Sequence, residues 1–270
     1  MALRETTLFG PTDRVEMVLR RIREFEPIAL KHNPAGYWVA FSGGKDSTVL
    51  LDLVRRAGVK HEAHFSLTTV DPPELLAFVR EHYPEVHRDR PREGMFALIV
   101  RNAMPPTRVA RYCCNHLKER GGRGYMILTG VRWAESTQRS KRKMSETCYK
   151  QASLFLHPII DWSDADVWAY IRERGLPYCR LYDEGFKRIG CVGCPMTRQK
   201  RWAQFARWPK FEALYRRACD RAAEKPGSRW KSGAEMFAWW MSDCRASTPD
   251  DQPTMFGDDE GEDDASAGCL

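Results

Sequence analysis

The sequence predicts an α/β fold in which helices flank a parallel sheet, followed by a helical C-terminal cap. Short apolar runs bounded by glycine are typical of buried parallel strands, and amphipathic segments alternate with them along the chain. Such alternation joins parallel strands by right-handed crossovers. The cap is predicted by segment 200–245, which has helical character and is rich in tryptophan and basic residues.

The expected elements follow in order from the N-terminus. Apolar residues at helical spacing predict a helix over 12–26, with Pro27 as its stop. The run "GYWVAF" predicts a buried strand over 36–41. The remaining expected elements are a helix at 45–58 stopped by Gly58, a strand at 62–69, a helix at 72–83 opened by proline, strands at 125–131 and 154–160, and a helix at 163–175 capped by Ser163.

Composition limits the class of protein. The chain has 270 residues, 43% of them hydrophobic, which is enough for a sizeable core. No apolar run reaches the roughly 18 residues of a membrane span, and the first residues lack the pattern of a secretory signal. We therefore expect a cytoplasmic protein that does not cross a membrane. Thiols stay reduced in that compartment, so the nine cysteines predict something other than a disulfide framework.

Charge is unevenly distributed along the chain. The net charge is +7, but eight carboxylates and no lysine or arginine follow Arg245, so residues 1–245 alone carry +15. A body this basic favours an anionic partner such as a nucleotide or a nucleic acid. The alternative is an ordinary solvated basic surface screened by an acidic tail.

A strand, a glycine-rich loop and a helix follow one another at "FSGGKDST", which is the arrangement of an anion site. Glycines let the backbone approach a phosphate, and amides at a helix start point outwards. The candidate phosphate-binding residues are Ser42, Gly43, Gly44, Lys45, Asp46, Ser47 and Thr48. The stretch is not a Walker A loop, but it resembles the S-G-G-x-D-S pyrophosphate loop of the adenine nucleotide α-hydrolase superfamily. That resemblance implies a Rossmann-like sheet that binds ATP or an adenylyl sulfate and acts at the α-phosphate.

The stretch "LTGVRWAESTQRS" places polar residues at the carboxyl end of a predicted strand, where open α/β sheets bind ligands. Its pattern G-x-R-x-x-E-S-x-x-R is similar to the sulfonucleotide reductase branch of the superfamily. "HPIIDWSDADVWAYI" and "GLPYCRLYDEGFKRIGCVGCP" resemble the same branch, so the likeness to the phosphoadenosine phosphosulfate reductase family runs from about 36 to 196. It implies nucleotide contacts from Gly130, Thr68, Thr69 and Asp71. It also implies that Lys45, Arg132 and Arg139 act catalytically by stabilising charge at the reacting phosphate or sulfate. Mg²⁺ is a further candidate there.

Two cysteine pairs, Cys113-Cys114 and Cys191-x-x-Cys194, can assemble four thiolates. Four cysteines suit zinc or an iron–sulfur cluster. Adjacent cysteines make a poor zinc knuckle, whereas a wider cluster takes each thiolate at a different iron, so the cluster is favoured over zinc. The set is similar to the [4Fe–4S] pattern of the adenylyl sulfate reductases. Lone histidines such as His157 are expected to be core or surface groups.

The resemblance fails at the catalytic thiol. Sulfonucleotide reductases carry a cysteine in a Glu-Cys-Gly-x-His context near the C-terminus; this chain has only Cys269, in "SAGCL". Three functions therefore stay open. They are a sulfonucleotide reductase with Cys269 as nucleophile and a thioredoxin-like thiol partner, an ATP-dependent sulfurtransferase acting on tRNA or DNA, and a non-catalytic nucleotide and cluster sensor.

Four regions are expected. They are an N-terminal helix (1–35), a nucleotide-binding α/β domain with the cysteine site (36–199), a helical cap (200–245) and a disordered acidic tail (246–270). The cap would suit nucleic acid through stacking and phosphate contacts, but we favour a cap whose tryptophans pack on the sheet. Those tryptophans are Trp202, Trp208, Trp230, Trp239 and Trp240.

Overall fold

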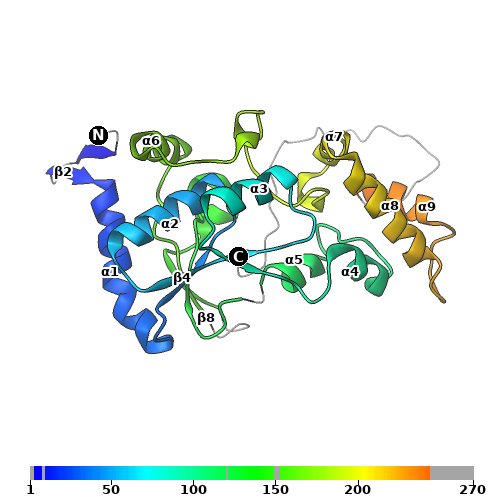
Figure 1. The fold of residues 1–270 in the computed structure, drawn as a ribbon, viewed down its shortest axis with the longest axis horizontal. Helices are drawn as coiled ribbons and strands as arrows, with labels where there is room; N and C mark the ends of the chain where they lie inside the picture. The colour runs from blue at the N-terminus through cyan, green and yellow to red at the C-terminus, as the bar shows by residue number, and fades with distance from the viewer. Residues whose placement is uncertain (1–2, 8–9, 120, 149–152, 244–270) are drawn as a thin grey trace.

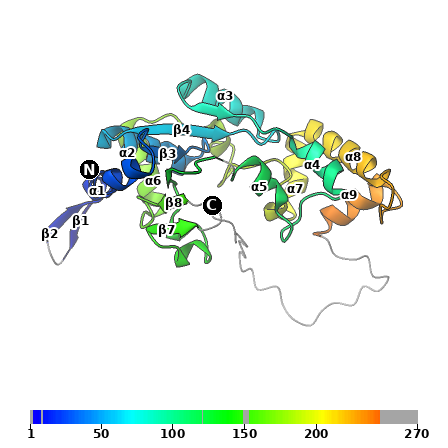
Figure 2. The same cartoon turned by 90° about the horizontal axis from the view of Figure 1, so that it is seen from below.

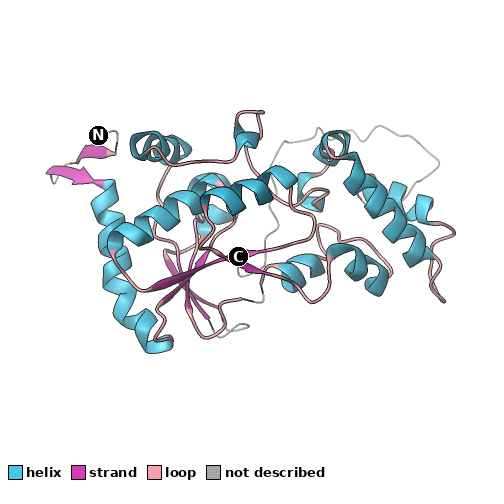
Figure 3. Ribbon diagram, in the orientation of Figure 1, coloured by secondary structure: helices cyan, strands magenta, loops and turns pink. Residues whose placement is uncertain are grey.

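Six strands form the central sheet in the order β5-β4-β3-β6-β8-β7. A computed structural model describes residues 3–7, 10–119, 121–148 and 153–243, and Figures 1 and 3 show helices packed around the sheet. The strands are β3 (Tyr37–Ala40), β4 (His61–Ser66), β5 (His87–Asp89), β6 (Met126–Leu128), β7 (Ser145–Cys148) and β8 (Ser153–Leu156). All neighbouring pairs are parallel except β7 with β8, which is antiparallel. The α/β class predicted from the sequence is therefore confirmed.

The chain reverses its direction of travel across the sheet beside β3. It runs from β3 to β4 and β5 on one side, then crosses to β6 on the other side of β3. This makes the carboxyl ends of β3 and β6 the topological switch point, where ligands bind in open α/β sheets. Both polar motifs found in the sequence begin at these two strand ends.

Most of the helices occupy two regions of the molecule. Near the sheet lie α1 (Arg14–His32), α2 (Lys45–Ala57), α3 (Pro73–His82) and α6 (Asp164–Arg174). At the far end lie α4 (Met95–Asn102), α5 (Tyr112–Leu117), α7 (Lys200–Arg207), α8 (Pro209–Ala223) and α9 (Gly233–Met241), and Figures 1 and 2 both show this separation. No helix in the described part of the chain combines the length and apolar character needed to span a bilayer.

The first helix differs from the prediction at both ends. Before it lies a two-stranded antiparallel hairpin, β1 (Arg4–Thr7) with β2 (Gly10–Asp13), and Asp13 caps the helix. Pro27 does not stop the helix, which continues to His32. Pro27 is exposed, so the carbonyl group left without its N–H partner faces solvent, where water can satisfy it.

The tryptophans of the cap do not pack on the sheet, so that expectation was wrong. Trp240 is fully buried and donates to the Pro106 carbonyl at 2.7 Å, and Trp208 donates to Glu74 of α3 at 3.0 Å. Trp202 is half exposed. The cap covers α4 and the cysteine segments instead, because α8 packs against α9 and α4. The expected tail at 246–270 lies outside the described residues.

Candidate functional site

The loop between β3 and α2 is held in shape by its own hydroxyl groups. Ser47 Oγ donates to the Gly44 carbonyl at 2.9 Å and accepts from the Ser42 N–H at 3.1 Å. Gly43 has a φ of +70°, and a Cβ there would lie 2.7 Å from Leu75 Cδ1. The loop thus needs glycine for both its backbone conformation and its fit against α3. The first-turn amides of α2 lack acceptors within the helix; Lys45 N–H donates to the Tyr182 hydroxyl, and those of Asp46 and Ser47 remain suited to an anion.

Thr48 lies apart from the rest of this motif. Its side chain is 1% exposed, and its N–H already donates to the Gly44 carbonyl within the helix. A side chain in this position contributes to the core rather than to the loop surface. Of the other phosphate-binding candidates, Ser42 is exposed, Gly44 and Asp46 are partly buried, and Gly43, Lys45 and Ser47 are buried.

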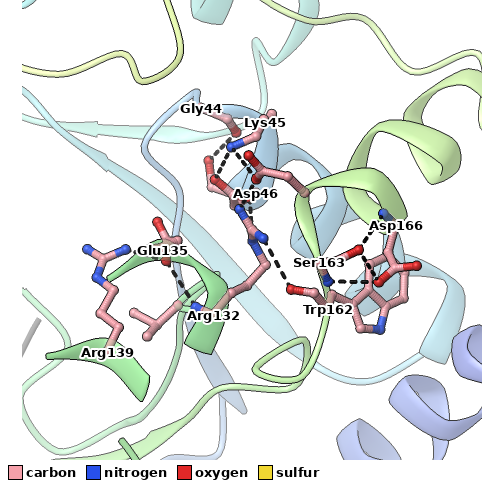
Figure 4. A network of polar contacts seen from close by, with 12 residues as sticks. Gly44, Lys45, Asp46, Arg132, Glu135, Arg139, Trp162, Ser163 and Asp166 are labelled. Atoms are coloured by element: carbon pink, nitrogen blue, oxygen red, sulfur yellow. Dashed lines mark hydrogen bonds and ion pairs between the residues drawn. The ribbon is translucent and has the colours of Figure 1, made fainter. Parts of the chain in front are cut away.

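Arg132 joins three segments beneath the loop (Figure 4). Its side chain is 1% exposed; Nε donates to Asp46 Oδ1 at 2.7 Å, Nη1 to the Trp162 carbonyl at 3.1 Å, and Nη2 to Asp164 Oδ1 at 2.5 Å. Lys45 Nζ lies 3.3 Å from both Asp46 Oδ2 and Asp164 Oδ1. The cations Lys45 and Arg132 and the carboxylates Asp46 and Asp164 therefore neutralise one another. Arg132 acts as a clamp, because it ties Asp46 of the loop to residues 162–164.

The carboxylate of Asp164 is held ionised within this network. Partial burial would raise its pKa, but the hydrogen bond from Arg132 and the charge of Lys45 outweigh that effect and lower the pKa below its ordinary value. The rest of the Asp164 side chain is exposed to solvent. It opens α6 next to the N-cap Ser163, which forms a capping box with Asp166.

Gly130 and Arg139 have different surroundings. A Cβ on Gly130 would lie 3.0 Å from the backbone carbonyl of Asp46, so glycine is required for β6 to approach α2 this closely. Arg139 forms an ion pair with Glu135, and that carboxylate also accepts the Arg132 N–H at 3.0 Å. Arg139 is thus linked to Arg132 through Glu135 (Figure 4).

The segment after β4 connects the loop region with the cysteines. Asp71 accepts two hydrogen bonds of 2.7 Å from Thr68, one from the N–H and one from the hydroxyl, and both residues are buried. Thr69 has a φ of +64°, and its hydroxyl accepts from the Met95 N–H at the start of α4. Val70 accepts from the Val192 N–H at 2.8 Å. Residues 68–71 therefore lie beside the cysteine loop, with Thr68 and Val70 in contact with Cys191 and Val192.

Tyr182 is a component of the loop region that sequence reasoning missed. The hydroxyl of this partly buried side chain accepts from the Lys45 N–H at 2.9 Å, at the first turn of α2. Burial raises its pKa, so it remains a neutral phenol. The only signal in the sequence was its place within the family-like stretch "GLPYCRLYDEGF". Sequence reasoning also missed Asp164. Like Tyr182, it contacts residues that lie far away in the chain.

The structure brings the two cysteine pairs together. Cys113 and Cys114 open α5, whereas Cys191 and Cys194 lie in a loop that follows Ile189. The Cys113 thiol donates to Cys114, and this bond, together with Lys118 and Arg111, lowers the pKa of Cys114 to about 5. Cys191 is the largest of the influences that raise the pKa of Lys118. Cys113 thus interacts electrostatically with the other three thiols, and Cys114, Cys191 and Cys194 share the cation of Lys118.

These thiols do not form the site of a single metal ion. Across residues 3–7, 10–119, 121–148 and 153–243, no three histidine, cysteine or carboxylate side chains are arranged to hold one ion. A donor set of four free thiols around a lysine still fits the chemistry of a wider cluster, whose negative charge the lysine would offset. Cys269, the expected nucleophile, lies outside the described residues. His157 is fully buried, as expected for a core group.

The sequence model of the phosphoadenosine phosphosulfate reductase domain matches residues 36–197, which include the loop after β3 and all four clustered cysteines. Among curated proteins, the uncharacterized protein MJ0066 of Methanocaldococcus jannaschii is 30% identical over 68% of this chain and 42% of its own length. A second such archaeal protein, MJ0973, is 29% identical over 58% of this chain and 40% of its own. The chain therefore spans less than half the length of these relatives.

An adenosine 5'-phosphosulfate reductase from Staphylococcus haemolyticus is 25% identical over 61% of this chain and 75% of its own length. Among solved structures, the phosphoadenylyl-sulfate reductase of Candida auris, in a phosphate complex, aligns with a TM-score of 0.47 at 20% identity. That alignment covers 69% of this chain and 96% of the other.

Proposed function

The chain belongs to the phosphoadenosine phosphosulfate reductase family, and we propose that it is an enzyme that binds an adenine nucleotide on the loop after β3 and acts at the phosphate or sulfate next to the adenosine. One observation carries this proposal: the loop lies at the switch point between β3 and β6, with the first turn of α2 above the Lys45–Asp46–Arg132–Asp164 network. In this network Arg132 positions the loop, and Lys45 is the cation that an incoming phosphate would meet.

The residues that would hold a cofactor are Cys113, Cys114, Cys191 and Cys194, and we propose a [4Fe–4S] cluster there. When bound, such a cluster would supply electron transfer or a structural and electrostatic centre. Lys118 would offset its charge, and residues 68–71 would separate it from the nucleotide. Mg²⁺ stays a prediction, with Asp46 and Asp164 as the nearest carboxylates in the network.

The leading reaction is reduction of an activated sulfate, as the names of the adenylyl sulfate reductases among its relatives suggest. That reaction needs a thiol nucleophile, for which Cys269 is the candidate, and a thioredoxin-like reductant. Replacing Cys269 by serine should then abolish sulfite release from an adenylyl sulfate.

A second candidate is ATP-dependent sulfur transfer to a nucleic acid. It is favoured by the absence of a Glu-Cys-Gly-x-His motif from the sequence and by the +15 charge of residues 1–245. It predicts conversion of ATP to AMP and pyrophosphate, with salt-sensitive binding of the acceptor. A non-catalytic sensor, the third candidate, would bind nucleotide without turnover.

Anaerobic incubation with ATP, adenosine phosphosulfate or phosphoadenosine phosphosulfate, followed by identification of the products, separates these functions. Ser42→Ala should weaken nucleotide binding, whereas Ser140→Ala, at an exposed serine of the 3₁₀ helix Arg139–Lys141, should not. If none of the three nucleotides binds, the proposal is wrong.

The cluster is tested by iron content and visible absorption after anaerobic purification. Cys191→Ser should lose iron, while Cys219→Ala, which alters a free cysteine buried in α8, should keep it. Protein that contains no iron, or a Cys191→Ser variant that retains all of it, would remove the cluster from the proposal without affecting the nucleotide site.

A further inference from the structure

A cavity of about 730 Å³ lies along the edge of the sheet, away from the network described above. It is bounded by α3, by the turn that follows α3 and by edge strand β5. Its lining includes Arg80, Arg88 and Arg90 around the apolar side chains of Leu67 and Leu76. These five residues define the arginine groove, to which no role has been assigned so far.

The three arginines carry unneutralised charge. None of their guanidinium groups forms an ion pair or a hydrogen bond with any other part of the chain that the structure describes, and all three side chains are exposed. Glu85, the one carboxylate in the cavity lining, is engaged by Arg55 of α2. The groove therefore presents three free cations.

The alternation of β5 explains why its own acidic residue does not neutralise them. Successive side chains of a strand point to opposite faces. Asp89 lies on the face of His64, with Oδ2 at 3.0 Å from Nδ1, and the His87 ring stacks on His64 on the same face at 4.8 Å. Arg88 pairs in register with the buried Phe65 and so faces α3. Arg90 directly follows the last residue of β5 and also lines the cavity.

This geometry suits an extended anion with apolar parts better than a single small ion. One cation lies on β5 and a second just beyond its end, a third lies on α3, and two leucine side chains share the lining with them. Phosphates would meet the guanidinium groups bidentately, and bases would cover the apolar floor. Duplex nucleic acid keeps its bases stacked inside, so the floor favours an unpaired strand.

We propose that the arginine groove binds a single strand of nucleic acid. The groove leads to the carboxyl edge of the sheet, because Leu67 lies in its wall, donates to the Asp89 carbonyl at 2.9 Å and directly precedes Thr68. A strand held in the groove would thus reach the region assigned to the nucleotide. The inference does not depend on which reaction occurs there, or on whether ATP binds.

The test is the fluorescence anisotropy of labelled 20-nucleotide oligo(dT) and oligo(U), titrated with the full chain without added nucleotide. The double variant Arg88→Ala/Arg90→Ala should bind at least tenfold more weakly. The slope of log K against log salt should fall by about 1.4, since each single-strand phosphate contact contributes about 0.7. Comparing the two oligonucleotides shows whether DNA or RNA binds more tightly.

The matched control is Arg172→Ala/Arg221→Ala, which removes the same charge from exposed positions on α6 and α8. It should bind like the unaltered chain, and thermal melting should show both double variants folded. The proposal is overturned if the unaltered chain binds neither strand, if both double variants lose equal affinity, or if inorganic tripolyphosphate competes as well as the oligonucleotide at equal phosphate concentration. Tighter binding of a duplex of equal length would also overturn it. Arg88→Ala/Arg90→Ala should bind ATP like the unaltered chain. ATP binding therefore tests the nucleotide site and oligonucleotide binding tests the groove, so the two proposals can fail separately.

Discussion

Arg132 is the single residue on which the loop geometry depends most. Its buried guanidinium holds Asp46, Asp164 and the Trp162 carbonyl at once. Replacing it with methionine keeps much of the volume but leaves Asp46 with Lys45 alone. Breaking a buried ionic network on one side costs about 3–5 kcal/mol, so we expect a loss of about 3 kcal/mol in the free energy of unfolding, measured in urea, together with weaker nucleotide binding.

The control for this prediction is Arg172→Met, at an exposed arginine of α6. Such surface substitutions usually change stability by no more than about 0.5 kcal/mol. If Arg132→Met were no more destabilising than Arg172→Met, the clamp would have no energetic role.

His157 makes stability depend on pH. Burial, reinforced by the charge of Arg142, lowers the pKa of His157 to about 4. Its Nδ1 forms a hydrogen bond of 2.6 Å with the Thr129 hydroxyl. The unfolded chain binds a proton at about pH 6.5, so the stability due to the neutral ring is complete above that pH and is lost as the pH falls towards 4. His157→Gln should remove up to about 3 kcal/mol of the difference in unfolding free energy between pH 7 and pH 4.

Urea unfolding at a series of pH values measures this dependence. His32→Gln, at an exposed position in the last turn of α1, should keep the pH profile of the unaltered chain. An unchanged profile in His157→Gln would show that acid sensitivity arises elsewhere, for example from the carboxylates of the loop network.

Among the elements, helix α2 has a glycine near each end, and only the N-terminal one belongs to the candidate binding loop. Glycines flank both ends of this helix with similar backbone angles, Gly43 at φ +70° and Gly58 at φ +73°. A Cβ on Gly58 meets nothing within 4 Å, whereas one on Gly43 would clash with Leu75. Gly58→Ala should therefore cost about 1–2 kcal/mol of stability from its backbone alone and leave nucleotide affinity unchanged.

Gly43→Ala should cost more stability than Gly58→Ala and should also lower nucleotide affinity, because the loop must move away from α3. Calorimetric titration with nucleotide, combined with thermal melting, separates the two effects. Equal losses of affinity in both variants would mean that overall stability, rather than loop shape, controls binding.

The elements that sequence reasoning found are those with strong local signals. Strand β3 and helix α2 have apolar periodicity, glycine boundaries and a loop motif between them. Strands β5 (HRD) and β7 (SETC) are short, polar edge strands, so only their neighbours define them. Local propensity predicts a helix stop at Pro27, because the sequence does not show that this residue faces solvent, where a proline is tolerated within a helix.

The candidate site divides in the same way. The loop, the arginines and the two cysteine pairs each lie within a short motif, so spacing and family likeness located them. Tyr182 contacts Lys45 across 137 positions, and Asp164 contacts Arg132 across 32. Such pairs form only when β6, β8 and α6 come together around α2. The burial of Arg132 between Asp46 and Asp164 could therefore be seen only in the structure.

At the scale of the whole molecule, the cysteine loop is the connection between cap and sheet. Val192 donates to Val70 after β4, while its carbonyl accepts from the Tyr215 hydroxyl of α8 at 3.0 Å. Gly193 donates to Gln204 of α7, and a Cβ there would lie 2.8 Å from the Tyr215 ring. The loop is therefore held from both sides, which predicts that cap and sheet unfold in one transition.

Tyr215→Phe tests this coupling with the loss of one hydroxyl. The Val192 carbonyl would lose a buried partner, which costs about 1–3 kcal/mol. In protein loaded with the proposed cluster, the freed loop should release iron to a chelator faster than in the unaltered chain. Tyr178→Phe, which removes an exposed hydroxyl bonded to Asp183 at 3.0 Å, is the matched control and should change neither property. Tryptophan fluorescence, to which the cap contributes five of the nine tryptophans, and far-ultraviolet circular dichroism should give coincident melting curves in the unaltered chain. A loop held from both sides cannot loosen on one side without affecting the other. Separate melting transitions in the unaltered chain, or equal iron release in the Tyr215→Phe and Tyr178→Phe variants, would therefore show that the cap is an independent unit.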